Sequence, residues 1–301
     1  MRLIDVLLLI ALSAIWGASF MFMRYLAPIL GPLGTADLRI LIAGIVLVLA
    51  FSIAGFKLKW GERWRRYLVV GLLNSAIPGL LYCLAALSLP GSVEAVLNAL
   101  SPCFGAIFAA IWLGERLDGR KVLGLALGLA GVGVVSGIGR EGGQGAGLLA
   151  ALACVAATAC YGLAGVYIKK RAKDIEPRSM AAGSQLLGGL FLLPGLAAYP
   201  PAGILQPKVA LIALVFALLC SAIAYLIYYR LIADVGPTKA LTVTFLIPVF
   251  GILWGGLFLG ERVDAAMLGG SALILCGTAL VAGLAKKKRP IRLEAGSADY
   301  T

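Results

Sequence analysis

The apolar stretches of this chain are its most restrictive feature, because nearly every window of about 20 residues is apolar, which is the length that crosses a bilayer as a helix. The stretches are continuously apolar, whereas the strands of a membrane β-barrel alternate between apolar and polar residues. Hydrophobic residues make up 61% of the chain and charged residues only 13%, compared with about 25% charged residues in a typical soluble domain. The sequence therefore predicts an all-α polytopic membrane protein.

Ten apolar stretches are candidates for transmembrane helices. They cover approximately residues 3–26, 34–55, 64–88, 91–112, 119–138, 146–169, 178–199, 208–232, 237–258 and 265–285. The first stretch follows Arg2, as the apolar region of a signal peptide would, but it is too long for that role and leads directly into further spans. We therefore expect it to be retained as the first transmembrane helix.

The distribution of positive charge predicts the orientation. Most of the 26 Lys and Arg residues lie within 57–66, 116–121 and 169–178 or after residue 285, and ten alternating helices place these segments on one side of the membrane. Cytoplasmic loops are enriched in Lys and Arg. We therefore expect an inner (plasma) membrane protein with both termini cytoplasmic, in which residues 286–301 form a tail whose last residues are typical of a flexible or added end.

A charged phrase occurs twice in the chain, as LGERLD from Leu113 and as LGERVD from Leu259, 146 residues later. The same shift aligns residues on both sides of the phrase. Further identities pair Ser75-Ala76-Ile77 with Ser221-Ala222-Ile223, Tyr82 with Tyr228, Pro102 with Pro248, Gly124 with Gly270, and Gly131 with Gly277. The chain is therefore expected to consist of two sequence repeats.

Each repeat contains five of the predicted helices, the first in residues 1–140 and the second in residues 146–285. Because five is an odd number, the second repeat has to enter the membrane in the opposite direction to the first. Inverted repeats are typical of secondary transporters, whose substrate site lies near the midplane between the two halves. The repeat thus predicts both the architecture and the class of function.

Each copy of the charged phrase ends in an Asp, Asp118 or Asp264, that can cap the helix that follows by accepting its free amide protons. The Glu of each copy, Glu115 or Glu261, is harder to assign, because a carboxylate near a helix C-terminus is disfavoured by the helix dipole. Pairing with a neighbouring Arg or with the start of another helix would offset this. Two interpretations stay open, a structural turn and the latch of a gate.

Several classes of protein chemistry are excluded by residues that the chain lacks. The sequence contains no His, which excludes Ser-His hydrolysis, His-ligated zinc and His proton relays. It also contains no GxxxxGK[ST] loop for ATP binding, and its six cysteines lie in apolar runs without CxxC spacing. We expect no catalytic residue, no metal and no cofactor.

The net charge of +12 would suggest nucleic acid in a soluble protein, but its placement here indicates membrane topology. We therefore expect no nucleic-acid partner, and anionic lipid head groups as neighbours of the basic loops. Gly124, Gly128 and Gly131 form a small-residue face that packs either inside the bundle or between two protomers. A homodimer is thus one expected assembly.

Three stretches resemble the EamA repeats of the drug/metabolite transporter superfamily: IWGASF at 15–20, the proline-bearing helix ending in WLGE at 112–115, and its second copy ending in FLGE at 258–261. The resemblance covers both halves and is greatest to YddG-type exporters of amino acids, including aromatic ones. It implies a central cavity lined mainly by helices 1, 3, 4, 6, 8 and 9. In the second half, Tyr161-Gly162 stands where Trp16-Gly17 stands in the first.

Polar and aromatic side chains deep in the predicted helices are candidates for a substrate site, because polar groups in a membrane need partners. Asn74 and Asn98 stand out, since an amide has several hydrogen-bonding groups to satisfy, whereas Ser and Thr more commonly bond to a nearby carbonyl. Tyr82 is either a gate or an interfacial residue, and Tyr228 is interpreted as interfacial. The candidates are Trp16, Asn74, Pro78, Tyr82, Asn98, Ser101, Pro102, Tyr161, Ser221, Tyr225, Thr244 and Pro248.

Pro102 and Pro248 lie in the middle of matched predicted helices. Each frees a carbonyl one turn earlier and can kink its helix. Polar backbone freed near the midplane is tolerated only beside protein or water. We therefore expect the pathway to pass these prolines, with a kink used purely for packing as the alternative.

No charged residue falls in the middle third of any predicted span. Glu94 lies one turn into its helix, where the dipole favours an acid, and Arg39 lies near a helix end. Tight proton coupling then has no obvious carrier, so we expect facilitated diffusion or weakly coupled exchange. A phosphate-bearing substrate would require a deep Lys or Arg, and none is evident.

These observations predict a secondary transporter that exports small neutral or zwitterionic metabolites, above all amino acids including aromatic ones, by alternating access. One alternative is an exporter of nucleobases, lipids or drugs in the same superfamily. Another is a non-transporting membrane subunit or receptor. An integral-membrane enzyme is disfavoured, because it would need a cluster of catalytic groups that the sequence does not show.

Overall fold

The computed structural model describes residues 2–136, 146–235 and 242–283, and the regular elements within them are all helices. Seven helical segments in this part of the chain are long and apolar enough to cross a membrane, and shorter apolar helices accompany them. Many large apolar side chains are exposed, as suits helices surrounded by lipid. The prediction of an all-helical, multi-pass membrane protein is confirmed. The expected helix start at 237–241 and the tail 286–301 lie outside the described residues.

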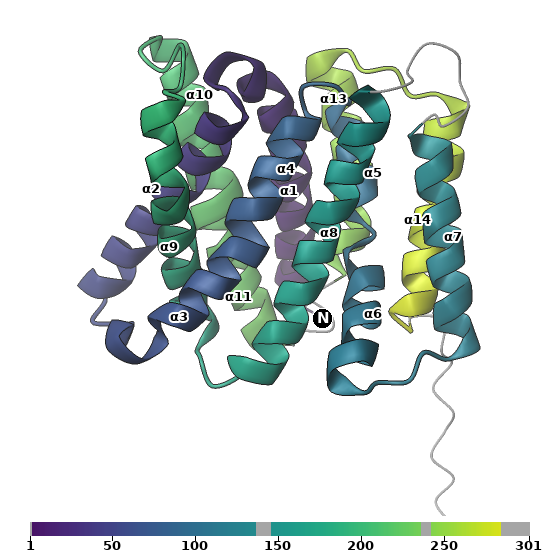
Figure 1. The fold of residues 1–301 in the computed structure, drawn as a ribbon, viewed down its shortest axis with the longest axis horizontal. Helices are drawn as coiled ribbons and strands as arrows, with labels where there is room; N and C mark the ends of the chain where they lie inside the picture. The colour runs from purple at the N-terminus through teal and green to yellow at the C-terminus, as the bar shows by residue number, and fades with distance from the viewer. Residues whose placement is uncertain (1, 137–145, 236–241, 284–301) are drawn as a thin grey trace, which may run out of the picture.

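The helices form one bundle in which successive segments run in opposite directions (Figure 1). We call the end that holds the N-terminus the near end. The opposite end, which holds the connections from α4 to α5 and from α13 to α14, is the far end. The elements are α1 (Leu3–Leu30), α2 (Pro32–Ile53), α3 (Trp60–Gly71), η1 (Leu72–Ala76), α4 (Ile77–Ala85), α5 (Gly91–Asn98), α6 (Ser101–Leu113), α7 (Gly119–Val135), α8 (Ala146–Arg171), α9 (Pro177–Ala198), α10 (Pro207–Ala217), η2 (Leu218–Ile223), α11 (Ala224–Val235), α13 (Val243–Leu259) and α14 (Ala265–Val281).

Two of the long helices contain a wider, π-helical segment, and the two segments occupy matched positions in the repeats. η1 interrupts the helix from α3 to α4, and η2 interrupts the helix from α10 to α11. Pro78 follows η1 and lacks an amide proton, but no proline follows η2 within α11, so proline is not the common cause. Such segments are frequent at functional sites because they disturb the regular hydrogen bonding of the helix.

The two matched prolines do not have the same surroundings. The predicted helix over 91–112 is divided, because α5 ends at Asn98 and Pro102 stands in the first turn of α6. Pro248 lies inside α13, as expected. The prediction that Pro102 lies in the middle of a helix is therefore wrong. A proline is well tolerated in a first helical turn, where its missing amide proton has no partner to lose.

The halves meet where glycines allow helix backbones to approach closely. A β-carbon at Gly17 in α1 would lie 2.7 Å from the β-carbon of Phe250 and 3.0 Å from the amide nitrogen of Gly251, in α13. At the second crossing between the halves, a β-carbon at Gly162 in α8 would lie 2.6 Å from the amide nitrogen of Gly105, in α6. These crossings place Trp16 and Tyr161, each one residue before its glycine, at corresponding positions.

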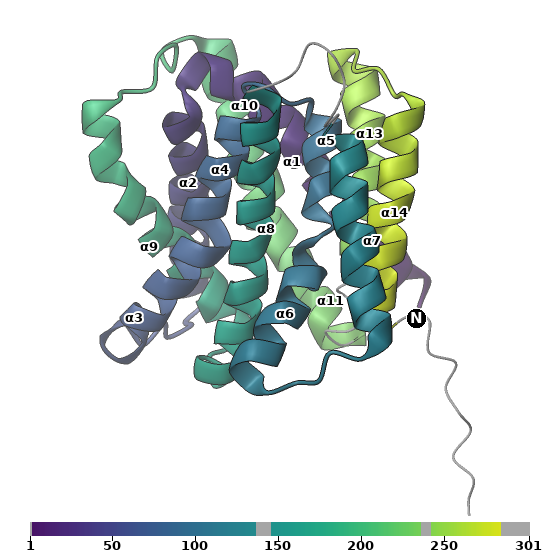
Figure 2. The ribbon, with the colours of Figure 1, turned by 45° about the vertical axis from the view of Figure 1, so that its right-hand side comes forward.

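The glycine face of α7 is used inside the bundle. α7 and α14 lie side by side at one edge (Figure 2). A β-carbon at Gly124 would lie 2.5 Å from the carbonyl oxygen of Gly277, and one at Gly131 would lie 2.8 Å from that of Gly270. A second copy of the chain would have to bind elsewhere, because α14 already covers this face.

Both aspartates of the repeated phrase cap helices. Asp118 accepts a hydrogen bond from the amide of Lys121 at 2.9 Å, and Asp264 accepts one from the amide of Met267 at 2.7 Å. These bonds use two of the amide protons that a helix start leaves without a partner. The prediction of two N-caps is confirmed.

Candidate functional site

Four side chains from α1, η1 and α11 form a first group, the Trp16 cluster, which consists of Trp16, Asn74, Tyr225 and Tyr228. The Trp16 ring lies 6.2 Å from the Tyr225 ring, edge to face, and 5.3 Å from the Tyr228 ring. The amide nitrogen of Asn74 donates a hydrogen bond to the Tyr225 hydroxyl at 3.3 Å. Asn74 therefore reaches across the bundle from one repeat to the other.

A second group, the Tyr161 cluster, consists of Phe20, Tyr82, Asn98 and Tyr161. The rings of Tyr82 and Tyr161 are stacked with centroids 6.2 Å apart, and Phe20 packs edge to face on Tyr82 at 5.3 Å. The Tyr82 hydroxyl donates to the side-chain oxygen of Asn98 at 3.2 Å. Each cluster thus combines stacked or edge-packed rings with one amide.

The two clusters correspond across the repeats. Trp16 packs on Tyr228, and Tyr161 packs on Tyr82. Tyr82 and Tyr228 are aligned by the 146-residue shift. The ring of Tyr228, which the sequence analysis interprets as interfacial, lies on the side chain of Trp16 from α1. Trp16 and Phe20 stand one turn apart on α1, so the clusters are neighbours.

Three further candidates lie at the starts of helices. The Ser101 hydroxyl donates to the backbone oxygen of Asn98 at 2.7 Å, a local bond of the kind expected for Ser in helices. Pro78 lies in the first turn of α4 and Thr244 in that of α13. The structure thus brings Trp16, Asn74 and Tyr225 together, and Tyr82, Asn98 and Tyr161 together, while Ser101 at the start of α6 bonds to the backbone at the end of α5.

Arg39 of α2 is a central residue that the sequence analysis did not select. Its Nε donates to the Ser221 hydroxyl in η2 at 3.0 Å, and its guanidinium lies 4.8 Å from the centre of the Phe216 ring. Ser221 lies one helical turn before Tyr225 of the Trp16 cluster. Although Arg39 stands near the start of α2, its long side chain carries the charge toward the middle of the bundle.

At the far end, Glu261 joins the segment after α13 to the start of α5. Its carboxylate accepts hydrogen bonds from the amide of Gly91 at 2.7 Å and the amide of Ser92 at 2.9 Å, and from the Ser92 hydroxyl at 2.5 Å. A carboxylate is favoured at a helix N-terminus, where free amide protons and the helix dipole both attract it. Glu261 thus connects residues of the two repeats.

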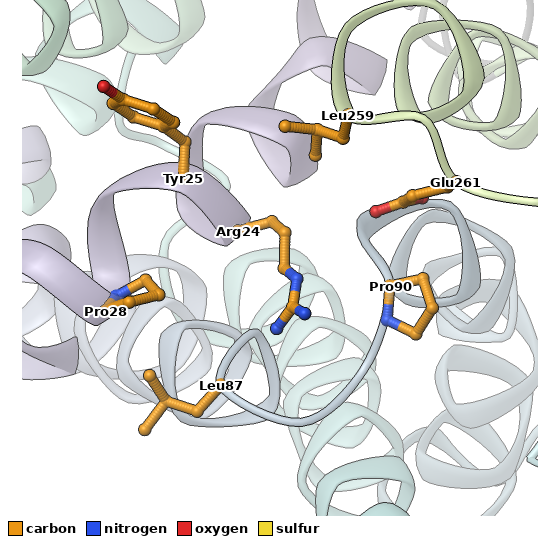
Figure 3. Close-up of a pocket in the computed structure, with 7 residues that line it drawn as sticks. All are labelled: Arg24, Tyr25, Pro28, Leu87, Pro90, Leu259 and Glu261. Atoms are coloured by element: carbon orange, nitrogen blue, oxygen red, sulfur yellow. The ribbon is translucent and has the colours of Figure 1, made fainter.

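A cavity of about 440 Å³ lies beside this contact at the far end (Figure 3). Arg24 from α1 and Glu261 both border it, together with Leu87, Pro90 and other residues of the same end. A guanidinium nitrogen of Arg24 donates to the backbone oxygen of Ala86, which holds the α4–α5 connection against α1. The cavity is separate from the two clusters, because none of their residues lines it.

Glu115, the counterpart of Glu261, has a different partner. Its carboxylate forms an ion pair with Lys169 of α8 at 2.7 Å. The ammonium of Lys169 donates a hydrogen bond that lowers the pKa of Glu115, but both side chains are exposed. Exposed ion pairs contribute little to stability because water and salt screen them. Of the two Glu residues in the repeated phrase, Glu261 therefore binds the start of α5 at the far end. Glu115 pairs with a surface Lys at the near end.

Glu94, in the first turn of α5, is fully buried. Neither of its carboxylate oxygens has a hydrogen-bond partner among the described residues. Burying an unpaired carboxylate is costly, and a buried acid avoids that cost by holding its proton. Asp37 of α2 has the same surroundings, since it is fully buried and neither of its carboxylate oxygens has a hydrogen-bond partner among the described residues.

Comparison with known proteins decides the family. The model of the EamA-like transporter family matches the chain twice, over residues 3–137 and 148–283. The chain belongs to the EamA-like transporter family. This transporter is 30% identical over 277 residues to an uncharacterized transporter, YvbV, of Bacillus subtilis, covering 91% of this chain and 90% of that one. The family resemblance predicted from the repeated motifs is confirmed.

Two further proteins are similar to this transporter over most of its length. It is 23% identical to a probable terminal-alkyne amino-acid exporter of Streptantibioticus cattleyicolor, covering 88% of this chain and 89% of the other. A solved crystal structure aligns with a TM-score of 0.65 at 21% identity, over 95% of this chain and 98% of that chain. The latter similarity supports the fold of the helix bundle.

Proposed function

We propose that this protein exports small neutral or zwitterionic metabolites, with amino acids, including aromatic ones, as its principal substrates. The observation that carries the proposal is the pair of corresponding clusters, each of which combines packed rings from both repeats with an amide from the first repeat. Aromatic side chains bind apolar and aromatic groups by packing, and an amide offers both donors and acceptors. The similarity to a probable terminal-alkyne amino-acid exporter supports the same substrate class.

The proposed mechanism is alternating access in an inner membrane with both termini in the cytoplasm. The two repeats rock against each other and open the clusters to one side at a time. In the described conformation, Glu261 ties the α13 end to the start of α5, so the far end is held together. With cytoplasmic termini, the far end faces outward, and release of substrate requires this contact to open.

A panel of labelled solutes tests the proposal. Purified protein in proteoliposomes should take up aromatic and other neutral amino acids with saturation, while protein-free liposomes should not. The panel should include nucleobases and lipid-like drugs as alternative substrates of the family. Uptake confined to those compounds, with none for any amino acid, would contradict the proposed substrate class.

Replacing Tyr161 with alanine should weaken transport of aromatic amino acids more than transport of alanine. The Tyr161 ring stacks on Tyr82, and an aromatic pair contributes about 0.5–1.5 kcal/mol, so the expected rise in KM for phenylalanine is roughly two- to tenfold. Tyr167→Ala is the matched control, because Tyr167 lies on the same helix but packs on Trp112 outside both clusters. Equal effects of the two variants would argue against a substrate role for Tyr161.

We propose facilitated or weakly coupled transport, and Glu94 provides the test. Uptake by wild type should depend little on an imposed pH gradient, and Glu94→Gln should leave that dependence unchanged, since glutamine preserves the shape of a protonated Glu. The measurement is initial uptake at matched internal and external pH and under gradients of either sign. A strong response in wild type that Glu94→Gln abolishes would establish Glu94 as a proton carrier and overturn weak coupling.

A further inference from the structure

Arg39 has an unusual combination of surroundings for a charged residue in a membrane-spanning helix. Its Nε donates a hydrogen bond to Ser221, and the central carbon of its guanidinium lies over the Phe216 ring. Among residues 2–136, 146–235 and 242–283, no carboxylate lies within ion-pair distance of it. Its two terminal nitrogens, which carry four of its five N–H donors, have no hydrogen-bond partner among these residues.

The nearest acid in sequence does not neutralise this charge. Asp37 is two residues away on the same helix, and residues at that spacing do not face each other. Asp37 is fully buried, and neither of its oxygens has a hydrogen-bond partner in the described part of the chain. The positive charge of Arg39 is therefore not matched by its own helix.

Charged groups inside a membrane protein normally pair with one another, and those that do not mark a pathway for a charged ligand. Arg39 stands beside the Trp16 cluster, because its hydrogen-bond partner Ser221 lies one helical turn before Tyr225, whose ring packs on Trp16. A ligand that packs on these rings would hold its charged group within reach of the guanidinium. The two free nitrogens form a fork that matches the two oxygens of a carboxylate.

We propose that Arg39 is the residue that binds the substrate's carboxylate. The inference rests on the proposed function and deepens it, because it makes a carboxylate a requirement for recognition. One guanidinium matches the single negative charge of an amino-acid carboxylate, whereas a phosphate group carries up to about two charges. The clusters bind the side chain, and Arg39 fixes the orientation of the backbone end.

The test compares an amino acid with its carboxamide, which has the same side chain and ammonium group but no negative charge. Initial uptake of L-phenylalanine and L-phenylalaninamide is measured in proteoliposomes with wild type, Arg39→Gln and Arg39→Lys. Wild type should prefer phenylalanine by at least about tenfold in kcat/KM, the size expected for a charge-assisted hydrogen-bonded pair. Arg39→Gln should lose this preference, and Arg39→Lys should retain part of it.

Arg66→Gln is the matched control, because it removes a guanidinium that pairs with Asp174 outside the bundle. It should retain the full preference for phenylalanine. If Arg39→Gln does not fold, a competition experiment with the wild-type protein takes the place of the variant. Unlabelled phenylalaninamide should inhibit uptake of labelled phenylalanine at least about tenfold more weakly than unlabelled phenylalanine does.

The outcomes separate the two proposals. Wild-type uptake of phenylalanine with an undiminished preference in Arg39→Gln, or equal competition by the amide, overturns the role of Arg39 and leaves the transport of amino acids standing. Absence of uptake of every amino acid by folded wild type contradicts the proposed function and, with it, the carboxylate site.

Discussion

The variant Gly162→Ala is expected to destabilise the folded bundle and to stop most transport. A β-carbon at Gly162 would lie 2.6 Å from the amide nitrogen of Gly105 and 2.7 Å from the carbonyl carbon of Phe104. Because backbone atoms cannot rotate away as a side chain can, α8 and α6 must separate. Overpacking of this kind lowers the free energy of unfolding by about 1–3 kcal/mol. Because the added methyl group would meet backbone atoms, we expect a loss near the upper end of that range.

The measurement is thermal unfolding of the purified protein in detergent, with transport in proteoliposomes as the second readout. Gly165→Ala is the matched control on the same helix, because a β-carbon there meets no atom within 4 Å. Alanine is favoured over glycine in a helix by roughly 0.8–1.0 kcal/mol, so the control should be unchanged or more stable. Gly17→Ala, at the corresponding crossing, should behave like Gly162→Ala. Equal unfolding temperatures for Gly162→Ala and Gly165→Ala would contradict the close approach.

The second large effect is expected from Glu261→Ala, which removes the contact between the far end of α13 and the start of α5. The amides of Gly91 and Ser92 lose their acceptor, and each unsatisfied buried group costs about 1–3 kcal/mol. The start of α5 should open more often, and hydrogen exchange of these two amides should accelerate by roughly 5- to 150-fold. Transport should change as well, because the far end no longer closes fully.

Hydrogen exchange followed by mass spectrometry on peptides covering residues 86–98 measures this opening. Glu115→Ala is the control in the same motif of the other repeat, where the lost partner is an exposed Lys169. Its effect on exchange and stability should be small. Unchanged exchange at Gly91 and Ser92 in Glu261→Ala would show that this carboxylate does not hold the far end closed, and the structural-turn interpretation would then apply to both copies.

Much of the fold followed from short-range rules. The length of the apolar stretches predicted a helical membrane protein, since about 20 apolar residues suit a bilayer-spanning helix. Asp118 and Asp264 were predicted to be N-caps, and both cap helices in the structure. This prediction was possible because a cap depends only on the three residues that follow it. The alignment of Tyr82 with Tyr228 predicted matched positions for the two residues, and in the structure each ring packs on an aromatic residue of the other repeat.

The two clusters and the far-end contact depend on which helix faces meet, and the sequence alone does not show how the helices pair. Glu261 bonds to residues about 170 positions away, and Arg39 reaches Ser221 across the bundle. Hydropathy placed the α-carbon of Arg39 near a helix end, whereas its long side chain contacts Ser221 and Phe216 on another helix. Local patterns thus specify helices, caps and repeats, while the pairing of distant polar groups is decided by packing between helices.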